Sequence, residues 1–414
     1  IIRGARQVGK TWIMKTFGQQ YFEKTAYVNF DNNARMKQVF EGDLDIERLV
    51  LAISAETGVS IEAENTLIIF DEIQEVPKAL TSLKYFHENA PQYAIVAAGS
   101  LLGVALHQGT SFPVGKVDFL DLYPLNFREF LCAMGEKQFV SMLDSCDTQM
   151  VTVFKTKYIE RLREYYFVGG MPEVVKDFSE KKDYNRVRVI QKNLINYYQQ
   201  DFSKHAEIKL VPRLNLVWNS IPMQLAKENK KYIYGQVREG SRAKDFELAI
   251  QWLLDCGLIH KVQRIQKPDL PLKAYIDFDA FKLFLVDIGL LIAMTDLDAK
   301  VIIEGNKIFT EFKGSLTEQY ILQQLISDVG VIPYYYSTQN SKGEIDFLVQ
   351  GKTSVIPIEV KAEENLKAKS LKAFCEKYQP SYAVRTSMSD YREQDWMTNI
   401  PLYAVKWIKN YVNQ

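Results

Sequence analysis

The first 122 residues predict an α/β fold in which helices cover both faces of a parallel sheet. Short apolar runs at 25–30, 67–70 and 93–100 have the length of buried strands, and an amphipathic pattern at 34–55 separates the first two. Alternation of such strands with helices is typical of a parallel sheet with crossover connections. The sequence therefore predicts an alternating α/β domain at 1–122.

The stretch GARQVGKT at 4–11 fits the pattern GxxxxGK[ST] and predicts a phosphate-binding loop. Two isoleucines before it can end a strand and TWIMKTF can continue as a helix, so the loop has the context that this chemistry requires. The glycines allow close approach of the backbone, the lysine reaches the terminal phosphates, and the threonine helps to hold magnesium. The predicted nucleotide-binding residues are Gly4, Ala5, Arg6, Gln7, Val8, Gly9, Lys10 and Thr11.

Two acidic residues follow directly on the apolar run Leu67–Phe70. Ligands of parallel sheets bind at the carboxyl edge of the strands, so Asp71 is expected to bind the magnesium held by Thr11. Glu72 is expected to polarise the water that attacks the terminal phosphate. The open alternative is a strand followed by an acid-capped helix that starts at Pro77.

The apolar run at 93–100 ends in Ser100, whose hydroxyl is predicted to sense the terminal phosphate, although Gly99 and Ser100 could form only a turn. No guanine-recognising NKxD motif occurs, so ATP with Mg²⁺ is expected rather than GTP. Residues that contact adenine are expected before Ile1, because part of the native N-terminus is expected to precede this residue.

The bulk composition describes an ordinary globular protein, with 47% hydrophobic and 25% charged residues. Its 51 basic and 51 acidic residues cancel, so any role on nucleic acid must rest on a local patch. Four cysteines without CxxC pairs predict reduced thiols, a cytoplasmic location and no zinc site. The most apolar stretch, 282–294, is too short for a membrane span and is predicted to be a buried helix.

Helical spacing dominates the middle of the chain, and residues 123–203 are predicted to form a helical lid. Lys116 and Arg128 are candidate cationic fingers for a neighbouring subunit, against the alternative of solvated surface residues. Helix signals followed by the alternating strands IHKVQRI and PLKAYID predict a winged helix at 204–300. Residues 204–273 hold 13 basic and 7 acidic side chains, which leaves phosphate-backbone contact and protein docking as open alternatives.

The segment GEIDFLVQGKTSVIPIEVKA at 343–362 predicts two strands joined by a turn. If the chain reverses around positions 352 and 353, Asp346 lies opposite Glu359, and two carboxylates about 5 Å apart repel each other by about 3 kcal/mol. A divalent cation such as magnesium would compensate, with Lys361 adding a positive charge. The alternative is a solvated polar face with a looser turn that staggers the acids.

Together these motifs resemble bacterial and archaeal AAA-type ATPases that carry a winged helix and a restriction-endonuclease-like domain of unknown function. The resemblance covers nearly the whole chain. It rests on GARQVGKT, LIIFDEIQ, FPVGKVDFLDLYPLNFREF, GGMPEVV, WNSIPMQLAKENKK, PLKAYIDFDAFKLFLVDIGLL, EIDFLV and IPIEVKA.

The last module of that family is similar to PD-(D/E)xK nucleases, which combine a helical Glu, an Asp on one strand and ExK on the next. The resemblance assigns these positions to Glu318, Asp346, Glu359 and Lys361, and implies that the acids hold magnesium while the lysine activates water. AAA-type sites often form between subunits, so the resemblance leaves a homo-oligomer open. However, residues 313–414 hold 12 basic and 11 acidic side chains, a weak attraction for a duplex.

The predicted fold class is therefore α/β. A P-loop ATPase with an AAA/ASCE parallel sheet (1–122) precedes a helical lid (123–203), a winged helix (204–300) and a restriction-endonuclease-like α/β domain (301–414). The predicted function is ATP hydrolysis coupled to action on DNA or RNA. The alternative is an ATP-dependent protein- or DNA-binding switch whose nuclease-like fold is catalytically idle. No membrane partner is expected.

Overall fold

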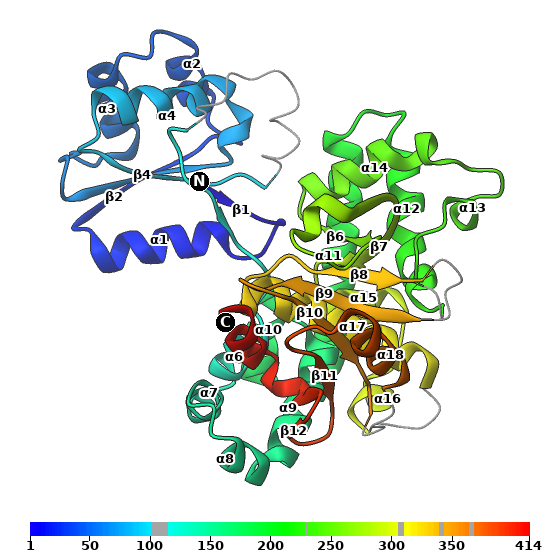
Figure 1. Ribbon diagram of the computed structural model, residues 1–414. Coiled ribbons are helices and arrows are strands. Elements are labelled where there is room, and N and C mark those ends of the chain that lie inside the picture. Colours follow the sequence, from blue (N-terminus) through cyan, green and yellow to red (C-terminus); the bar gives the residue numbers. More distant parts are fainter. Residues whose placement is uncertain (101–114, 228–229, 305–309, 339–342, 364–367) are drawn as a thin grey trace. The chain divides into compact units, whose positions relative to one another are not determined.

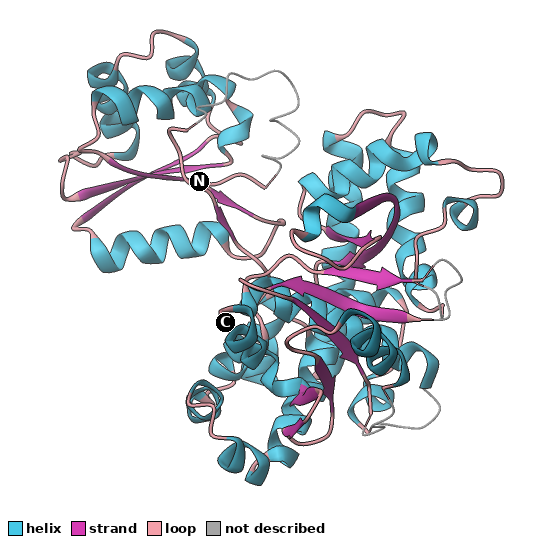
Figure 2. Ribbon diagram, viewed as in Figure 1, coloured by secondary structure: helices cyan, strands magenta, loops and turns pink. Residues whose placement is uncertain are grey.

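The computed structural model describes residues 1–100, 115–227, 230–304, 310–338, 343–363 and 368–414 (Figure 1). The chain divides into two compact units, and each is described by itself below. The first unit comprises residues 1–123 with 251–258, and the second comprises residues 124–250 with 259–414. The mixture of helices and strands is visible in Figure 2. No helix of the described part is long and apolar enough to cross a membrane.

The first unit is built on parallel strands. Strand β3 lies between β2 and β4, and a single parallel bridge between Ile2 and Ala98 places β1 beside the chain that follows β4. The resulting order is β2-β3-β4-β1-β5, so the carboxyl ends of all these strands meet at one edge. The strands are β1 (Ile2–Arg3), β2 (Lys24–Asn29), β3 (Thr66–Asp71), β4 (Ala94–Ala97) and β5 (Leu120–Asp121).

Helices cover both faces of this sheet, with α1 on one side and α2, α3 and α4 on the other (Figure 1). Alternate residues of β3 reach opposite cores: Phe70 packs toward α2–α4, and Ile69 packs beside Met14 of α1. The predicted two-sided burial of this strand is thereby confirmed. The helices are α1 (Lys10–Tyr21), α2 (Ala34–Glu41), α3 (Ile46–Thr57) and α4 (Pro77–Asn89), with a short 3-10 turn η1 (Ile73–Glu75).

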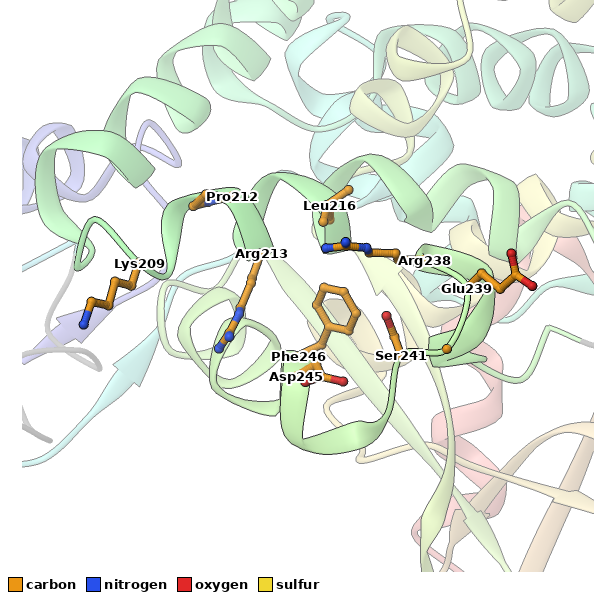
Figure 3. A pocket seen from close by; sticks show the side chains of 10 residues that line it. Lys209, Pro212, Arg213, Leu216, Arg238, Glu239, Ser241, Asp245 and Phe246 are labelled. Atoms are coloured by element: carbon orange, nitrogen blue, oxygen red, sulfur yellow. The ribbon is translucent and has the colours of Figure 1, made fainter.

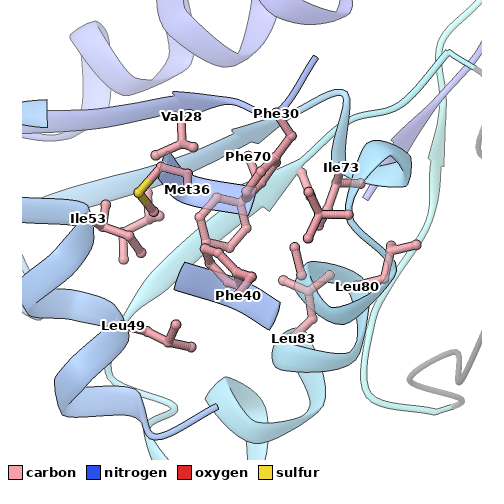
Figure 4. Close-up of a cluster of buried hydrophobic side chains, with 14 of the residues drawn as sticks. Val28, Phe30, Met36, Phe40, Leu49, Ile53, Phe70, Ile73, Leu80 and Leu83 are labelled. Carbon is pink, nitrogen blue, oxygen red and sulfur yellow. The ribbon is translucent and has the colours of Figure 1, made fainter. Parts of the chain in front are cut away.

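Three phenylalanines form the centre of the larger core (Figure 4). The rings of Phe30, Phe40 and Phe70 lie 5.3 to 5.6 Å apart between centroids, mostly in edge-to-face arrangements. Such pairs add about 0.5–1.5 kcal/mol each beyond the burial of apolar area. The ends of β2 and β3, which carry the candidate site, are therefore anchored on a rigid base.

The second unit begins with helices in the region predicted to be helical, 123–203. Arg, Glu and Tyr side chains along these helices make many of their contacts within the bundle, as expected for amphipathic segments. The helices are α6 (Phe127–Ala133), α7 (Lys137–Asp144), α8 (Thr148–Val153), α9 (Lys155–Val168), α10 (Pro172–Lys181) and α11 (Tyr184–His205).

Next come helices and an antiparallel hairpin, in the order that the sequence predicted for 204–300. They are α12 (Val211–Leu225), α13 (Tyr234–Val237), α14 (Ala243–Asp255), β6 (Ile259–Ile265) and β7 (Ile276–Leu285), with the 3-10 turn η2 (Leu272–Tyr275). The strand predicted from PLKAYID is wrong in its bounds, because 272–275 form this turn and the strand continues to Leu285.

The single buried helix predicted at 282–294 is also wrong. Residues 282–285 belong to β7, and helix α15 (Ile288–Met294) starts only after Asp287, whose carboxylate accepts a hydrogen bond from the Leu290 N–H at 3.1 Å. An apolar run does not distinguish a buried strand from a buried helix. The N-capping aspartate separates the two elements.

Among the described residues, the second unit contains an eight-stranded mixed sheet in the order β12-β13-β11-β10-β9-β8-β6-β7. The hairpin β6–β7 thus shares a sheet with the C-terminal strands through the parallel pair β6–β8, a connection that the sequence did not predict. The added strands are β8 (Tyr334–Ser337), β9 (Glu344–Gln350), β10 (Val355–Val360), β11 (Val384–Ser387), β12 (Arg392–Gln394) and β13 (Met397–Pro401). The helical elements are α16 (Ala299–Ile303), α17 (Thr310–Gln324), η4 (Leu325–Val329), α18 (Lys369–Tyr378), η5 (Leu402–Trp407) and α19 (Ile408–Val412).

The register predicted for the hairpin at 343–362 is confirmed. Strands β9 and β10 are antiparallel with Ile358 opposite Phe347, so the next position in the same register brings Glu359 opposite Asp346. Strand β9 also carries an extra residue relative to β8, because Tyr334 pairs with Leu348 whereas Tyr336 pairs with Ile345. A bulge of this kind re-aims side chains locally.

Candidate functional site

The loop at 4–11 turns sharply between β1 and α1. Gly4, Gln7 and Gly9 all have positive φ, at 145°, 64° and 96°. A Cβ atom at Gly4 would lie 2.2 Å from the carbonyl oxygen of Leu122, so only glycine fits there. Gly9 precedes α1 without a side-chain cap, which leaves the first-turn N–H groups of the helix available to an anion.

The side chain of Lys10 folds back onto this loop. Its Nζ donates hydrogen bonds to the carbonyl oxygens of Gly4 and Ala5, at 2.9 and 2.8 Å. Burial lowers the pKa of Lys10 to about 8, against the opposing charges of Glu72 and Asp71. The ammonium is thus positioned on the loop, where phosphate oxygens would compete for the same donors.

Thr11 and Asp71 meet although 60 residues separate them in sequence. The hydroxyl of Thr11 donates to Oδ2 of Asp71 at 2.7 Å, and the hydroxyl of Tyr27 donates to the same oxygen at 2.9 Å. Burial, with the charge of Asp71 beside it, raises the pKa of Tyr27 to about 12, so this hydroxyl stays a donor at neutral pH. The carboxylate of Asp71 is therefore held in one orientation.

Tyr27 and its neighbour Asn29 were missed by the sequence analysis. Asn29 pairs in register with Asp71 at the end of β2, and its side chain donates to the hydroxyl of Tyr27 at 3.4 Å. A signal was present, since these polar residues lie at the carboxyl end of a predicted strand of the same sheet.

Glu72 lies beside Asp71 in a left-handed conformation, with φ of 50°. Its carboxylate accepts hydrogen bonds from the Ser100 hydroxyl at 3.0 Å and from the Gln74 amide at 2.7 Å. Arg6 donates in turn to the oxygen of Ser100 at 3.1 Å. The structure thus brings Arg6 of the loop, Ser100 after β4 and Glu72 after β3 into one polar chain.

The two candidate cationic fingers both have anionic partners within their own units. The Lys116 ammonium lies 3.2 Å from the Glu88 carboxylate. Arg128 pairs with Asp328 at 3.0 Å and with Asp144 at 2.6 Å. Either residue would have to break these ion pairs to reach a phosphate.

At the C-terminal centre, Glu318 of α17 and Asp346 of β9 lie together with two lysines. Lys282, fully buried on β7, forms an ion pair with Glu344, and its Nζ lies 3.6 Å from Oε2 of Glu318. Lys230 forms an ion pair with the other oxygen of Glu318. Burial alone would raise the pKa of Glu318, but the charges of Lys230 and Lys282 lower it.

Glu359 and Lys361 make a different set of contacts. Glu359 accepts a hydrogen bond from the Leu371 N–H in the first turn of α18, at 3.1 Å, and its other oxygen lies 2.6 Å from Nζ of Lys361. Oδ2 of Asp346 instead accepts from the backbone N–H of Val360, at 2.7 Å. Both predicted carboxylates therefore already have hydrogen-bond donors of their own.

The two predicted metal sites differ in their fit to a divalent cation. Thr11 and Asp71 offer a hydroxyl and a carboxylate beside a phosphate-binding loop, which is the donor set that suits magnesium together with phosphate oxygens. The carboxylate of Asp346 accepts a backbone N–H, and the carboxylate of Glu359 accepts a backbone N–H and pairs with Lys361. These carboxylates therefore do not fit a metal ion. Within the described ranges, no group of at least 3 His, Cys, Asp or Glu side chains could hold a metal ion.

A separate cavity of about 410 Å³ opens between the starts of α12 and α14 (Figure 3). Three exposed basic side chains line it, together with the acids Glu239 and Asp245 and the ring of Phe246. The basic residues are Lys209, Arg213 and Arg238.

Comparison with known families adds three matches. Residues 159–301 match a domain of unknown function (DUF8612), and residues 313–405 match another domain of unknown function (DUF4143). No curated protein matches the chain. Residues 1–131 match the model of an AAA domain, which supports an ATPase-type domain in this part of the chain.

Proposed function

We propose that the chain binds and hydrolyses ATP with Mg²⁺ at the edge of the first sheet. The observation that carries this proposal is the hydrogen bond between Thr11 and Asp71, which joins the phosphate-binding loop to the acidic end of β3. The match of residues 1–131 to the AAA domain supports the same chemistry. Magnesium would neutralise charge on the phosphates, held through Thr11 and Asp71.

In this proposal each side chain has one task. Lys10 leaves the carbonyl oxygens of the loop and binds the terminal phosphates, while the N–H groups of Gly9 and the first turn of α1 cradle them. Glu72 orients the attacking water and accepts its proton. Ser100 and Gln74 hold the Glu72 carboxylate until the nucleotide draws Ser100 and Arg6 toward its terminal phosphate.

Isothermal titration with ATP and Mg²⁺, followed by phosphate release, tests the proposal. Lys10→Ala should lose ATP binding, and Asp71→Asn should lose Mg²⁺-dependent hydrolysis. Lys24→Ala is a matched control, because Lys24 lies on the opposite end of β2 in a surface ion pair with Glu62. Wild-type protein without affinity for ATP, or full hydrolysis by Lys10→Ala, would contradict the proposal.

A second candidate function is contact with the phosphodiester backbone of nucleic acid, at the cavity between α12 and α14. The specific observation is that the exposed side chains of Lys209, Arg213 and Arg238 line it, and that none of the three forms an ion pair within the described part of the chain. When exposed cations neutralise phosphates, counterions are released from the nucleic acid. The affinity for nucleic acid should therefore fall steeply as the salt concentration rises.

The test measures binding of duplex DNA, single-stranded DNA and RNA as a function of salt. Arg213→Ala plus Arg238→Ala should reduce the slope of log affinity against log salt by about two. Lys300→Ala plus Lys409→Ala removes the same charge from exposed positions elsewhere in the second unit and should leave the slope unchanged. If both double variants bind alike, or if only an acidic protein binds the cavity, the nucleic-acid proposal fails.

For the C-terminal part, the ion pairs of Glu318 favour the alternative of a binding module that does not cut. We therefore propose that intact protein shows no Mg²⁺-dependent cleavage of DNA or RNA that depends on Glu359 and Lys361. Cleavage by the wild type that Glu359→Ala plus Lys361→Ala abolishes would establish the nuclease function instead.

A further inference from the structure

The geometry points to a substitution of cations in the C-terminal centre: the ammonium groups of Lys230 and Lys282 take the place of a divalent metal ion among Glu318, Glu344 and Asp346. The inference goes beyond ATP hydrolysis and does not depend on it. It follows from the ion pairs and hydrogen bonds that the carboxylates of this centre already make.

Lys282 is the central element. It lies within the apolar strand β7 and is fully buried, where an ammonium is tolerated only with close anionic partners. It finds them in Glu344, with which it forms an ion pair, and in Glu318, whose Oε2 lies 3.6 Å from its Nζ. The ring of Tyr335 covers the same ammonium, with 4.8 Å between Nζ and the ring centroid. Lys282 therefore has no route to solvent without breaking these contacts.

Lys230 supplies the second positive charge. It comes from the chain that follows α12, and it forms an ion pair with Oε1 of Glu318 while its side chain is largely buried. The two oxygens of Glu318 thus face two different lysines. A divalent ion at this position would meet both ammonium groups, and the repulsion would be strong because water is largely excluded.

The remaining carboxylate is engaged as well. Oδ2 of Asp346 accepts the Val360 N–H, so Asp346 is tied to the backbone of the neighbouring strand. The centre therefore joins β7, α17, β9 and the chain after α12 through ion pairs within a single unit. Its role is to connect the predicted winged-helix segment to the C-terminal sheet, in place of metal-dependent chemistry.

Mn²⁺ binding, followed by electron paramagnetic resonance without nucleotide, tests the inference. Asp71→Asn serves as the background, because it removes the carboxylate of the N-terminal site from the measurement. This protein should bind no Mn²⁺ at the C-terminal centre. Adding Lys230→Met and Lys282→Met should create one Mn²⁺ site that Glu318→Gln removes, and Mn²⁺ should raise the thermal midpoint of this lysine-free protein.

Two results would overturn the inference. One is stoichiometric Mn²⁺ binding by the Asp71→Asn protein that is lost on adding Glu318→Gln. The other is a folded lysine-free protein that gains no Mn²⁺ site. If Lys282→Met prevents folding, the single variant Lys230→Met is used instead of the lysine-free protein. Freeing one oxygen of Glu318 should give weak Mn²⁺ binding that Glu318→Gln abolishes. Absence of this Mn²⁺ binding counts against the inference. Loss or retention of ATP hydrolysis bears on neither result.

Discussion

The carboxylate of Asp287 accepts a hydrogen bond from the backbone N–H of Gly170, with 2.6 Å between the two heavy atoms. Asp287 also caps α15 through the Leu290 N–H, and the side chain of Gln323 lies 3.5 Å from the same carboxylate. One buried acid thus fixes the junction of α9 and α10 against the start of α15. The motifs GGMPEVV and LVDIGLL, far apart in sequence, are two sides of this junction.

Replacement of Gly169 by alanine should strongly destabilise the second unit. Gly169 has φ of 74°, and a Cβ atom there would lie 2.2 Å from Oδ1 of Asp287. Backbone strain and displacement of a buried carboxylate together should cost about 3–4 kcal/mol of unfolding free energy. Urea unfolding measures this value.

Gly330→Ala is the matched control, because Gly330 has φ of 80° and nothing lies within 4 Å of its added Cβ. Only backbone strain remains there, so the expected loss is about 1 kcal/mol. Equal losses for the two variants would mean that contact with Asp287 is irrelevant.

The contribution of Asp287 to stability should fall as pH rises. Burial raises the pKa of Asp287 from 3.8 to about 6. Between these values the folded protein keeps a proton that the unfolded chain has lost, so the unfolding free energy decreases with pH. The two-unit difference corresponds to on the order of 3 kcal/mol.

Asp287→Asn isolates this effect, because asparagine does not titrate. Urea unfolding of both proteins at pH 4, 5, 6 and 7 gives the difference in unfolding free energy at each pH. The wild type should lose stability relative to Asp287→Asn across this range and level off near pH 7. A pH-independent difference would exclude titration of Asp287 in this window.

The arrangement of the candidate N-terminal site was largely predictable because it depends on local sequence patterns. A loop of glycines and a buried strand that ends in acids are both short patterns, and the parallel sheet brings their ends to one edge. The contact between Thr11 and Asp71 follows from that topology. Tyr27 was missed because a polar residue near the end of a strand is as often a solvent-exposed residue as part of a site.

The C-terminal part was less predictable because its key contacts join distant segments. The pairing of β6 with β8 and the convergence of Lys230 with Glu318 depend on tertiary packing that no local pattern encodes. Lys282 did leave a signal: a lysine inside the apolar stretch FKLFL needs a buried partner. Asp287 likewise marked the boundary between strand and helix within 282–294.

Glu72→Gln should abolish ATP hydrolysis while ATP binding remains. The amide retains acceptor and donor contacts with Ser100 and Gln74 but no longer takes a proton from water. Removal of a general base typically lowers the rate by about 10²–10⁴-fold. Single-turnover phosphate release and ATP titration separate the two effects.

The matched control is Glu75→Gln, because Glu75 ends the turn η1 that directly follows Glu72 but pairs with Lys37 at 3.7 Å. Hydrolysis by this variant should equal that of the wild type. A Glu72→Gln protein that hydrolyses ATP at the normal rate would require another base.

Tyr27→Phe should weaken the affinity of the proposed ATPase for magnesium without changing its maximal rate. The Tyr27 hydroxyl donates to the same oxygen of Asp71 as Thr11 does, so it orients a proposed metal ligand without touching the metal. Loss of such an outer partner typically costs about 10–100-fold in metal affinity. The Mg²⁺ concentration for half-maximal hydrolysis should rise by this factor, whereas ATP binding without Mg²⁺ should be unchanged.

Tyr21→Phe, on the exposed end of α1, should leave both quantities unaltered. A fall in the maximal rate at saturating Mg²⁺, with no shift in the midpoint, would instead assign Tyr27 a role in the chemical step.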